Sequence, residues 1–259
     1  MKLILAFLLL PAAALAQAAA APSIPVEQQN VRKAQALLDQ TIQALGGSAY
    51  LNIQDISQEG RTYSFHLGIP NSLGVQFWRF YKYPDKDRME LTKKRDVIFI
   101  ENAGKGYEIT YKGTKSQDTK DLQDYQRRHQ YGLDWVLRHW LHQPGVALFY
   151  EGPTVAEQKN AEQITIMNAQ NEGLTLYLDA ETHLPIKKTF SWRDPTDKQR
   201  NVEDEVYDAY RPVQGIMTPF SVTRFYNGDM SNQRFLSTVT YNQNLSDSLF
   251  EPGAVSIKP

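Results

Sequence analysis

Cysteine is absent from the 259 residues of this chain. Its absence excludes disulfide bonds, thiolate catalysis and Cys-ligated metal sites, so the fold must depend on its hydrophobic core alone. It also removes the lipid-modified Cys that follows the cleavage site of a lipoprotein. We therefore expect a chain that is not itself lipid-anchored.

A surplus of positive charge is also lacking, because 28 Lys and Arg residues stand against 29 Asp and Glu. Nucleic-acid binding normally needs a basic stripe or patch, so this balance argues against such a partner. Long apolar runs are scarce as well. Residues 3–10 form the longest one, about half of the 20 or so residues that a spanning helix requires, and no transmembrane segment is predicted in the mature chain.

The first residues have the order of an export signal. Lys2 precedes the apolar run, and small residues, among them Ala14 and Ala16, follow it. This order predicts a cleaved signal peptide over residues 1–16 and a protein that acts outside the cytosol. Residues 17–25 are rich in Ala and Pro and are expected to form a disordered leader. A single domain is predicted over residues 26–259, without an internal repeat.

Aromatic residues are abundant, with 14 Tyr, 11 Phe and 4 Trp, and they favour β-sheet. Alternating apolar and polar residues predict five strands between residues 62 and 111, and seven more between residues 147 and 241. The connections are short, so the strands must be antiparallel. Eleven or twelve strands exceed an ordinary open sheet of about four to six, and a sheet of this size is expected to curl.

Two segments have helical spacing. Apolar residues recur from Val31 to Leu45, where Gly46 and Gly47 provide a stop. A second helical pattern runs over residues 119–141 and predicts one broken helix or two short ones, with a kink at Gly132. Helices that cover one face of an antiparallel sheet give the α+β class.

Four phrases together resemble the LolA/LolB superfamily of periplasmic lipoprotein carriers. They are residues 174–188 (LTLYLDAETHLPIKK), 206–219, 244–252 (NLSDSLFEP) and the helix end at 44–47. The resemblance implies a curved antiparallel sheet that forms an incomplete barrel, with helices as a lid over its concave face. In the carriers that face holds lipoprotein acyl chains, and a stress-sensing relative senses such cargo. Arg79 is the best positional match to the arginine that gates cargo in them.

Candidate ligand-binding residues lie on the alternating strands, where they are expected to line one face of the sheet. The alternative is that they pack against the helices as core. Together with Arg79 they are Tyr63, Phe65, Leu67, Phe77, Met89, Leu91, Tyr107, Ile109, Tyr111, Leu174, Leu176 and Leu178.

Catalytic and metal-binding patterns are weak. The acidic run 203–205 is more typical of a solvated face than of an acid/base pair. His139 and His142 have helical spacing but lack a third ligand, so the end of a helix explains them better than zinc. Residues 104–106 are expected to form a hairpin turn rather than a phosphate loop. No nucleophile elbow of the form Gly-x-Ser-x-Gly occurs. No enzyme activity, metal or cofactor is predicted.

Three functions remain open from the sequence. The first is a periplasmic binding or carrier protein that shelters a lipid, a lipoprotein acyl chain or another apolar ligand. The second is an envelope sensor or interaction domain that binds a protein through an edge strand or the concave face. The third is an envelope hydrolase, which would require Glu203, Glu205 and a histidine to converge.

Overall fold

The structure is a computed structural model that describes residues 25–255. The predicted signal peptide and residues 17–24 of the predicted leader lie outside the described residues. Within the described residues, five α- and 3-10-helical segments precede β8 in the sequence and two short 3-10 helices follow β14. They are α1 (Val26–Leu45), α2 (Ser48–Leu51), α3 (Thr119–Gln130), α4 (Leu133–Arg138), η1 (Trp140–His142), η2 (Asp247–Phe250) and η3 (Pro252–Ala254).

Fourteen strands form the sheet. They are β1 (Asp55–His66), β2 (Ile69–Pro70), β3 (Val75–Lys82), β4 (Lys86–Leu91), β5 (Val97–Asn102), β6 (Lys105–Thr110), β7 (Gly113–Ser116), β8 (Ala147–Ala156), β9 (Lys159–Met167), β10 (Gly173–Asp179), β11 (Pro185–Arg193), β12 (Arg200–Val213), β13 (Ile216–Tyr226) and β14 (Asp229–Tyr241). The α+β class is confirmed. The sequence prediction lacked only the two shortest strands, β2 and β7.

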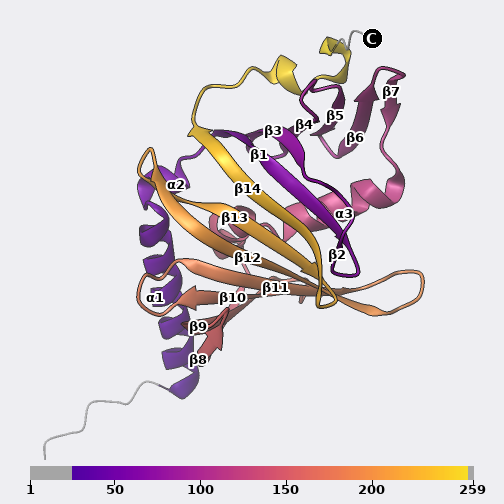
Figure 1. The fold of residues 1–259 in the computed structure, drawn as a ribbon. Helices are drawn as coiled ribbons and strands as arrows, with labels where there is room; N and C mark the ends of the chain where they lie inside the picture. Colours follow the sequence, from indigo (N-terminus) through magenta and orange to yellow (C-terminus); the bar gives the residue numbers. More distant parts are fainter. Residues whose placement is uncertain (1–24, 256–259) are drawn as a thin grey trace, which may run out of the picture.

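The strand order is β7-β6-β5-β4-β3-β1-β14-β13-β12-β11-β10-β9-β8, with β2 paired to β1 alone. All pairs are antiparallel, and consecutive hairpins build each half of the sheet. The two halves meet where β1 pairs with β14. The sheet is strongly twisted and open, with α1 alongside β8–β11 and α3 behind the sheet (Figure 1). The sheet is therefore an incomplete barrel, as the resemblance implied.

The first helix is longer than predicted, because it begins at Val26 rather than near Val31. Its predicted stop is confirmed. Gly46 has a φ of 130°, and the backbone N–H of Gly47 donates to the carbonyl of Ile42, as in a glycine-capped helix end. The second helical pattern is divided into α3 and α4, with Gly132 as the N-cap of α4.

The main core lies on the concave face of the sheet. Leu37 and Leu38 of α1 and Val136 of α4 pack there with side chains of β9 and β10. A smaller cluster lies on the opposite face of β5 and β6, where Phe250 of η2 covers Ile98, Ile100 and Ile109. The convex face is thus covered at one end by the C-terminal segment.

Candidate ligand-binding cavity

A cavity of about 630 Å³ lies between the concave face of the sheet and helices α3 and α4. This volume is within the range of about 300–1,000 Å³ that is typical of ligand sites. Its apolar wall includes Phe77, Met89, Phe99, Leu133, Val222 and Leu236. Its polar wall includes Arg79, Asp87, Glu101, Arg128, His129, Asp134, Lys188, Glu205, Arg224 and Arg234.

Three of the predicted ligand-binding residues line this cavity. Phe77, Arg79 and Met89 lie on β3 and β4 and point to its interior. Leu91 pairs with Phe77 and shares its face. Three leucines of β10 lie in the concave core instead, with at most 1% of their surface exposed, namely Leu174, Leu176 and Leu178. For these leucines, packing against the helices is the better interpretation.

The other predicted residues do not share the concave face. Thr62 of β1 lies opposite Arg234 on the cavity side, so Tyr63 and Phe65, in alternate phase, point outward or to the strand end. Tyr107 pairs with Ile100 of the convex cluster, which also contains Ile109. The turn residues Leu67 and Tyr111 are 70% and 69% exposed. The expectation of a single face was therefore wrong for these six residues.

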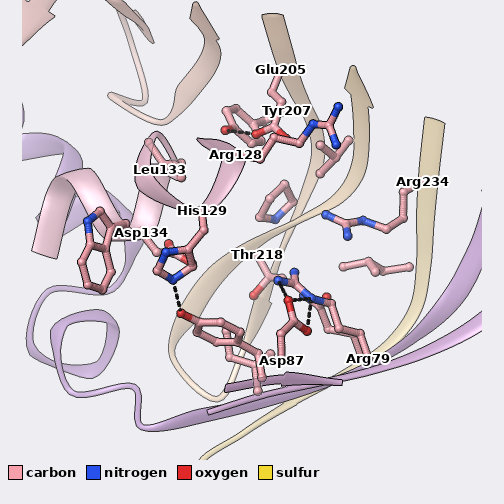
Figure 2. Close-up of a pocket in the computed structure, with 18 of the residues that line it drawn as sticks. Arg79, Asp87, Arg128, His129, Leu133, Asp134, Glu205, Tyr207, Thr218 and Arg234 are labelled. Atoms are coloured by element: carbon pink, nitrogen blue, oxygen red, sulfur yellow. Dashed lines mark hydrogen bonds and ion pairs between the residues drawn. The ribbon is translucent and has the colours of Figure 1, made fainter. Parts of the chain in front are cut away.

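Arg79 forms a bidentate ion pair inside the cavity. Its Nε donates to Asp87 Oδ1 at 2.9 Å, and its Nη2 donates to Oδ2 at 2.6 Å (Figure 2). Burial opposes the charge of Arg79, but the Asp87 carboxylate outweighs burial and raises the arginine pKa. Arg79 is consequently occupied by a partner within the chain, whatever its role toward a ligand.

Glu101 lies on β5 beside this pair. Burial and the negative charge of Asp87 raise the pKa of Glu101 to about 8, although Gln117 donates a hydrogen bond of 2.5 Å to its carboxyl. The side chain is therefore mostly protonated at neutral pH. The cavity consequently carries less negative charge than its list of carboxyl groups suggests.

A network of five charged side chains lies where α3 meets strands β11, β12 and β13 at the cavity. Lys188 Nζ contacts Glu205 Oε2 at 2.9 Å, and Arg224 Nη2 contacts Glu205 Oε1 at 2.9 Å. Arg224 and Arg128 of α3 both pair with Glu203, each at 3.1 Å. Lys188 and Glu203 are only 1% exposed. The prediction of a solvated face is thus wrong for Glu203 and Glu205.

The acidic run alternates across the sheet, which explains this outcome. Asp204 lies on the outer face, where it accepts a hydrogen bond from Thr189 and pairs with Lys187. Burial raises the pKa of Glu205, but Lys188 and Arg224 outweigh burial and hold it well below its usual range. A carboxylate held ionised in this way is poorly suited to donate a proton, so Glu205 does not fit the role of a general acid.

Polar contacts fasten the helical lid at the other end of the cavity. Tyr50 and Tyr83 donate hydroxyl hydrogen bonds to Asp134 of α4 at 2.8 and 2.9 Å. Tyr81 contacts His129 Nε2 of α3 at 2.9 Å. Burial lowers the pKa of His129, so its imidazole is mostly neutral at pH 7. Figure 2 shows His129 and Asp134 on the same side of the cavity.

His139 and His142 lie at the end of α4 and in η1. His139 is the C-cap of α4 and stacks on Trp135 with 3.9 Å between ring centroids. Burial and the charge of Arg138 lower its pKa, which disfavours a charged imidazole, and Arg138 is the basic residue of the last turn of α4. Within residues 25–255, no group of three or more His, Asp or Glu side chains is arranged to hold a metal ion.

Arg234 of β14 was missed by the sequence analysis. Its guanidinium points into the cavity (Figure 2). Within the described part of the chain it makes no hydrogen bond or ion pair, and its Nε is buried without an acceptor. Its one aromatic contact is with Phe77, 5.9 Å from the ring centroid. The sequence held one signal for it: Arg234 is two positions before the apolar Leu236 in β14, so alternation places both side chains on the same face of the sheet.

Solved structures share this fold. A DUF1329 family protein from Desulfovibrio piger aligns with a TM-score of 0.61 and 11% identity, over 86% of this chain and 99% of that one. A LolA superfamily protein from Nitrosomonas europaea gives 0.51 and 9%, over 84% and 97%. A Vibrio parahaemolyticus domain named for outer membrane lipoprotein sorting gives 0.53 and 9%, over 88% and 98%.

No family model and no curated protein matches the sequence. At 9–11% identity the structural similarity establishes the fold and not the ligand. The chain has the LolA-like fold of an incomplete barrel, and the structural part of the resemblance is confirmed. Among residues 25–255, every helix is too short or too polar to cross a bilayer.

Proposed function

We propose that this chain is a periplasmic binding or carrier protein whose cavity shelters a lipid, a lipoprotein acyl chain or a similar amphiphile. The observation that carries the proposal is the cavity of about 630 Å³ between the concave sheet and the helical lid. The export signal predicted over residues 1–16 supports a periplasmic location. The LolA-like fold is also found in a domain named for lipoprotein sorting, which is consistent with this class of ligand.

The binding energy would come from burial of alkyl groups against Phe77, Met89, Phe99 and Leu236. Each buried CH₂ contributes about 0.8 kcal/mol, so a chain of moderate length provides tight binding. Entry and release would require α3 and α4 to move away from the sheet. The hydrogen bonds from Tyr50 and Tyr83 to Asp134 hold this lid closed.

Native mass spectrometry of the gently extracted protein, together with uptake of a fluorescent neutral alkyl probe, tests the proposal. We expect a bound lipid, or saturable uptake of the probe. Val222→Trp fills the cavity and should abolish uptake, whereas Phe235→Trp, on the outer face and 41% exposed, should not. A protein that carries no lipid and takes up neither neutral nor charged alkyl probes would refute the proposal.

An envelope interaction domain is the second candidate. Strand β7 forms one edge of the sheet, pairs only with β6, and all four of its residues are exposed. An exposed edge can accept a strand from a partner protein. Recovery of a stable protein partner without bound lipid, lost when the β7 edge is blocked with proline at Thr114, would favour this function.

A further inference from the structure

Arg234 is a positive charge of the cavity wall that has no ion pair or hydrogen bond among residues 25–255. It lies on β14 directly across from Thr62, at the centre of the sheet and close to the seam between its two halves. Arg234 is partly exposed, but its Nε is buried without an acceptor, so the protein does not replace part of the hydration that this charge loses. A guanidinium remains charged at neutral pH and carries five N–H donors, so its need for an acceptor is large.

The two carboxylates whose charges act most on Arg234, Asp87 and Glu205, are already in use. Asp87 is bound by Arg79, and Glu205 is bound by Lys188 and Arg224. Figure 2 shows the guanidinium of Arg234 in the space between Asp87 and Glu205 rather than in contact with either.

The remaining acidic group beside Asp87 does not change this balance. Glu101 has a raised pKa and is mostly uncharged at neutral pH. Burial, together with the positive charges of Arg79 and Arg224, lowers the pKa of Arg234 to about 10. Arg79 and Arg224 lie close enough to Arg234 to contribute to this shift, so an anion bound at Arg234 would also be attracted by their positive charges.

We propose that Arg234 binds the anionic head group of an amphiphile, a carboxylate or a phosphate, inside the cavity. The planar fork of a guanidinium matches both groups and can bind either through two hydrogen bonds. The alkyl tail would extend over the apolar wall that begins at Phe77, which Arg234 contacts, and continues with Met89 and Leu236. This inference rests on the proposed function and specifies the class of ligand.

Matched probes that differ only in the head group test the inference. They are hexadecanoic acid, hexadecyl phosphate, hexadecanol and hexadecylamine, with acetate and inorganic phosphate as tail-free anions. We expect the two anionic amphiphiles to bind at least about tenfold more tightly than the alcohol and the amine, since hydrogen bonds to charged groups are the strong ones. The tail-free anions should bind weakly.

Arg234→Met removes the charge and keeps an unbranched side chain. It should lower the affinity for hexadecanoic acid and hexadecyl phosphate at least about tenfold and leave hexadecanol unchanged. Arg211→Met is the matched control, because Arg211 also lies over a ring, that of Phe220 at 4.6 Å, but is exposed and outside the cavity. The control should bind all probes like the wild type.

A thermal melt separates binding from a structural role. If Arg234 serves a ligand, the free Arg234→Met variant should be as stable as the wild type or more stable, because a partly buried charge without a partner is removed. A destabilised variant that loses all probes equally would overturn the inference. If the wild type binds hexadecanol and hexadecanoic acid with equal affinity, the inference is overturned while the proposed function stands. If inorganic phosphate binds as tightly as hexadecyl phosphate, the ligand of Arg234 is a free anion and not an amphiphile. Failure of all alkyl probes would instead refute the proposed function.

Discussion

The ion network at Lys188 gives a sharp prediction about stability. Lys188 lies in the middle of β11 with 1% of its surface exposed, and its Nζ donates to the carbonyl of Tyr131 at 2.7 Å and contacts Glu205 at 2.9 Å. Lys188→Met keeps an unbranched side chain, one atom shorter, and removes both polar contacts. We expect a marked loss of stability.

The magnitude follows from the groups that remain. Removal of one partner of a buried ion pair costs about 3–5 kcal/mol, because the other charge stays buried. Glu205 retains Arg224, which places the expected loss at the lower end, about 3 kcal/mol. For a chain of this size, about 3 kcal/mol lowers Tm by roughly 6–12 °C.

Urea unfolding monitored by tryptophan fluorescence measures the effect, and the next residue provides the control. Lys187 points to the opposite face, where it lies 3.4 Å from Asp204 and both side chains are partly exposed. Exposed ion pairs contribute about 0–1 kcal/mol, so Lys187→Met should lower the free energy of unfolding by no more than about 1 kcal/mol. Equal losses in the two variants would refute the assignment of the two faces.

The pH dependence has a defined sign. The folded-state pKa of Glu205 is lowered, so its ionised form stabilises the protein above the pKa of the unfolded chain, and this contribution is lost as pH falls below about 4.5. The stability difference between the wild type and Lys188→Met should therefore shrink in acid. A difference that does not depend on pH would show that the charge of Glu205 is not involved.

Three further changes have expected outcomes. Glu101→Gln should flatten the pH dependence of stability. The folded-state pKa of about 8 makes the wild type lose up to about 1.4 kcal/mol per pH unit as pH rises from 4.5 to 8. If the free energies of unfolding of the two proteins change in parallel over this interval, the prediction is contradicted. Gly60→Ala should destabilise by about 1–3 kcal/mol in denaturant unfolding, because its Cβ would collide with the carbonyl of Phe235 at the β1 bulge, and a neutral result would exclude that close approach. Asn30→Ala should cost about 1–3 kcal/mol and speed hydrogen exchange of the Tyr150 amide, because Asn30 pairs with both backbone groups of Tyr150 on the edge strand β8; unchanged exchange would refute this role.

Local patterns were sufficient to predict most elements of the fold. Helical spacing ended by Gly46 marks α1, and Gly132 separates α3 from α4, because these signals depend on a few neighbouring residues. Alternation located the strands but could not tell which of their two faces is concave. Met89 and Ile109 are both apolar members of alternating strands, yet strand pairing places them on opposite sides of the sheet.

The buried charges were the larger omission. Glu203 is held by Arg128, 75 positions earlier in the chain, and no local pattern connects two residues so far apart. A weak signal was nevertheless present, because Lys188 is in phase with the aromatic Phe190 and Glu205 is in phase with Tyr207. A charged residue in phase with buried aromatics indicates a polar interior. The polar half of the cavity could have been suspected on that basis.

The seam between β1 and β14 also determines when the cavity forms during folding. Ser237 of β14 donates to the carbonyl of Glu59 of β1, and the two residues are 178 positions apart. Each half of the sheet can form from neighbouring hairpins, but contacts between distant segments form slowly, and the seam cannot form before β14 has been made. The cavity has walls from both halves, so it exists only after β14 has paired with β1. Any ligand of this cavity could therefore enter only after the β1–β14 seam has formed.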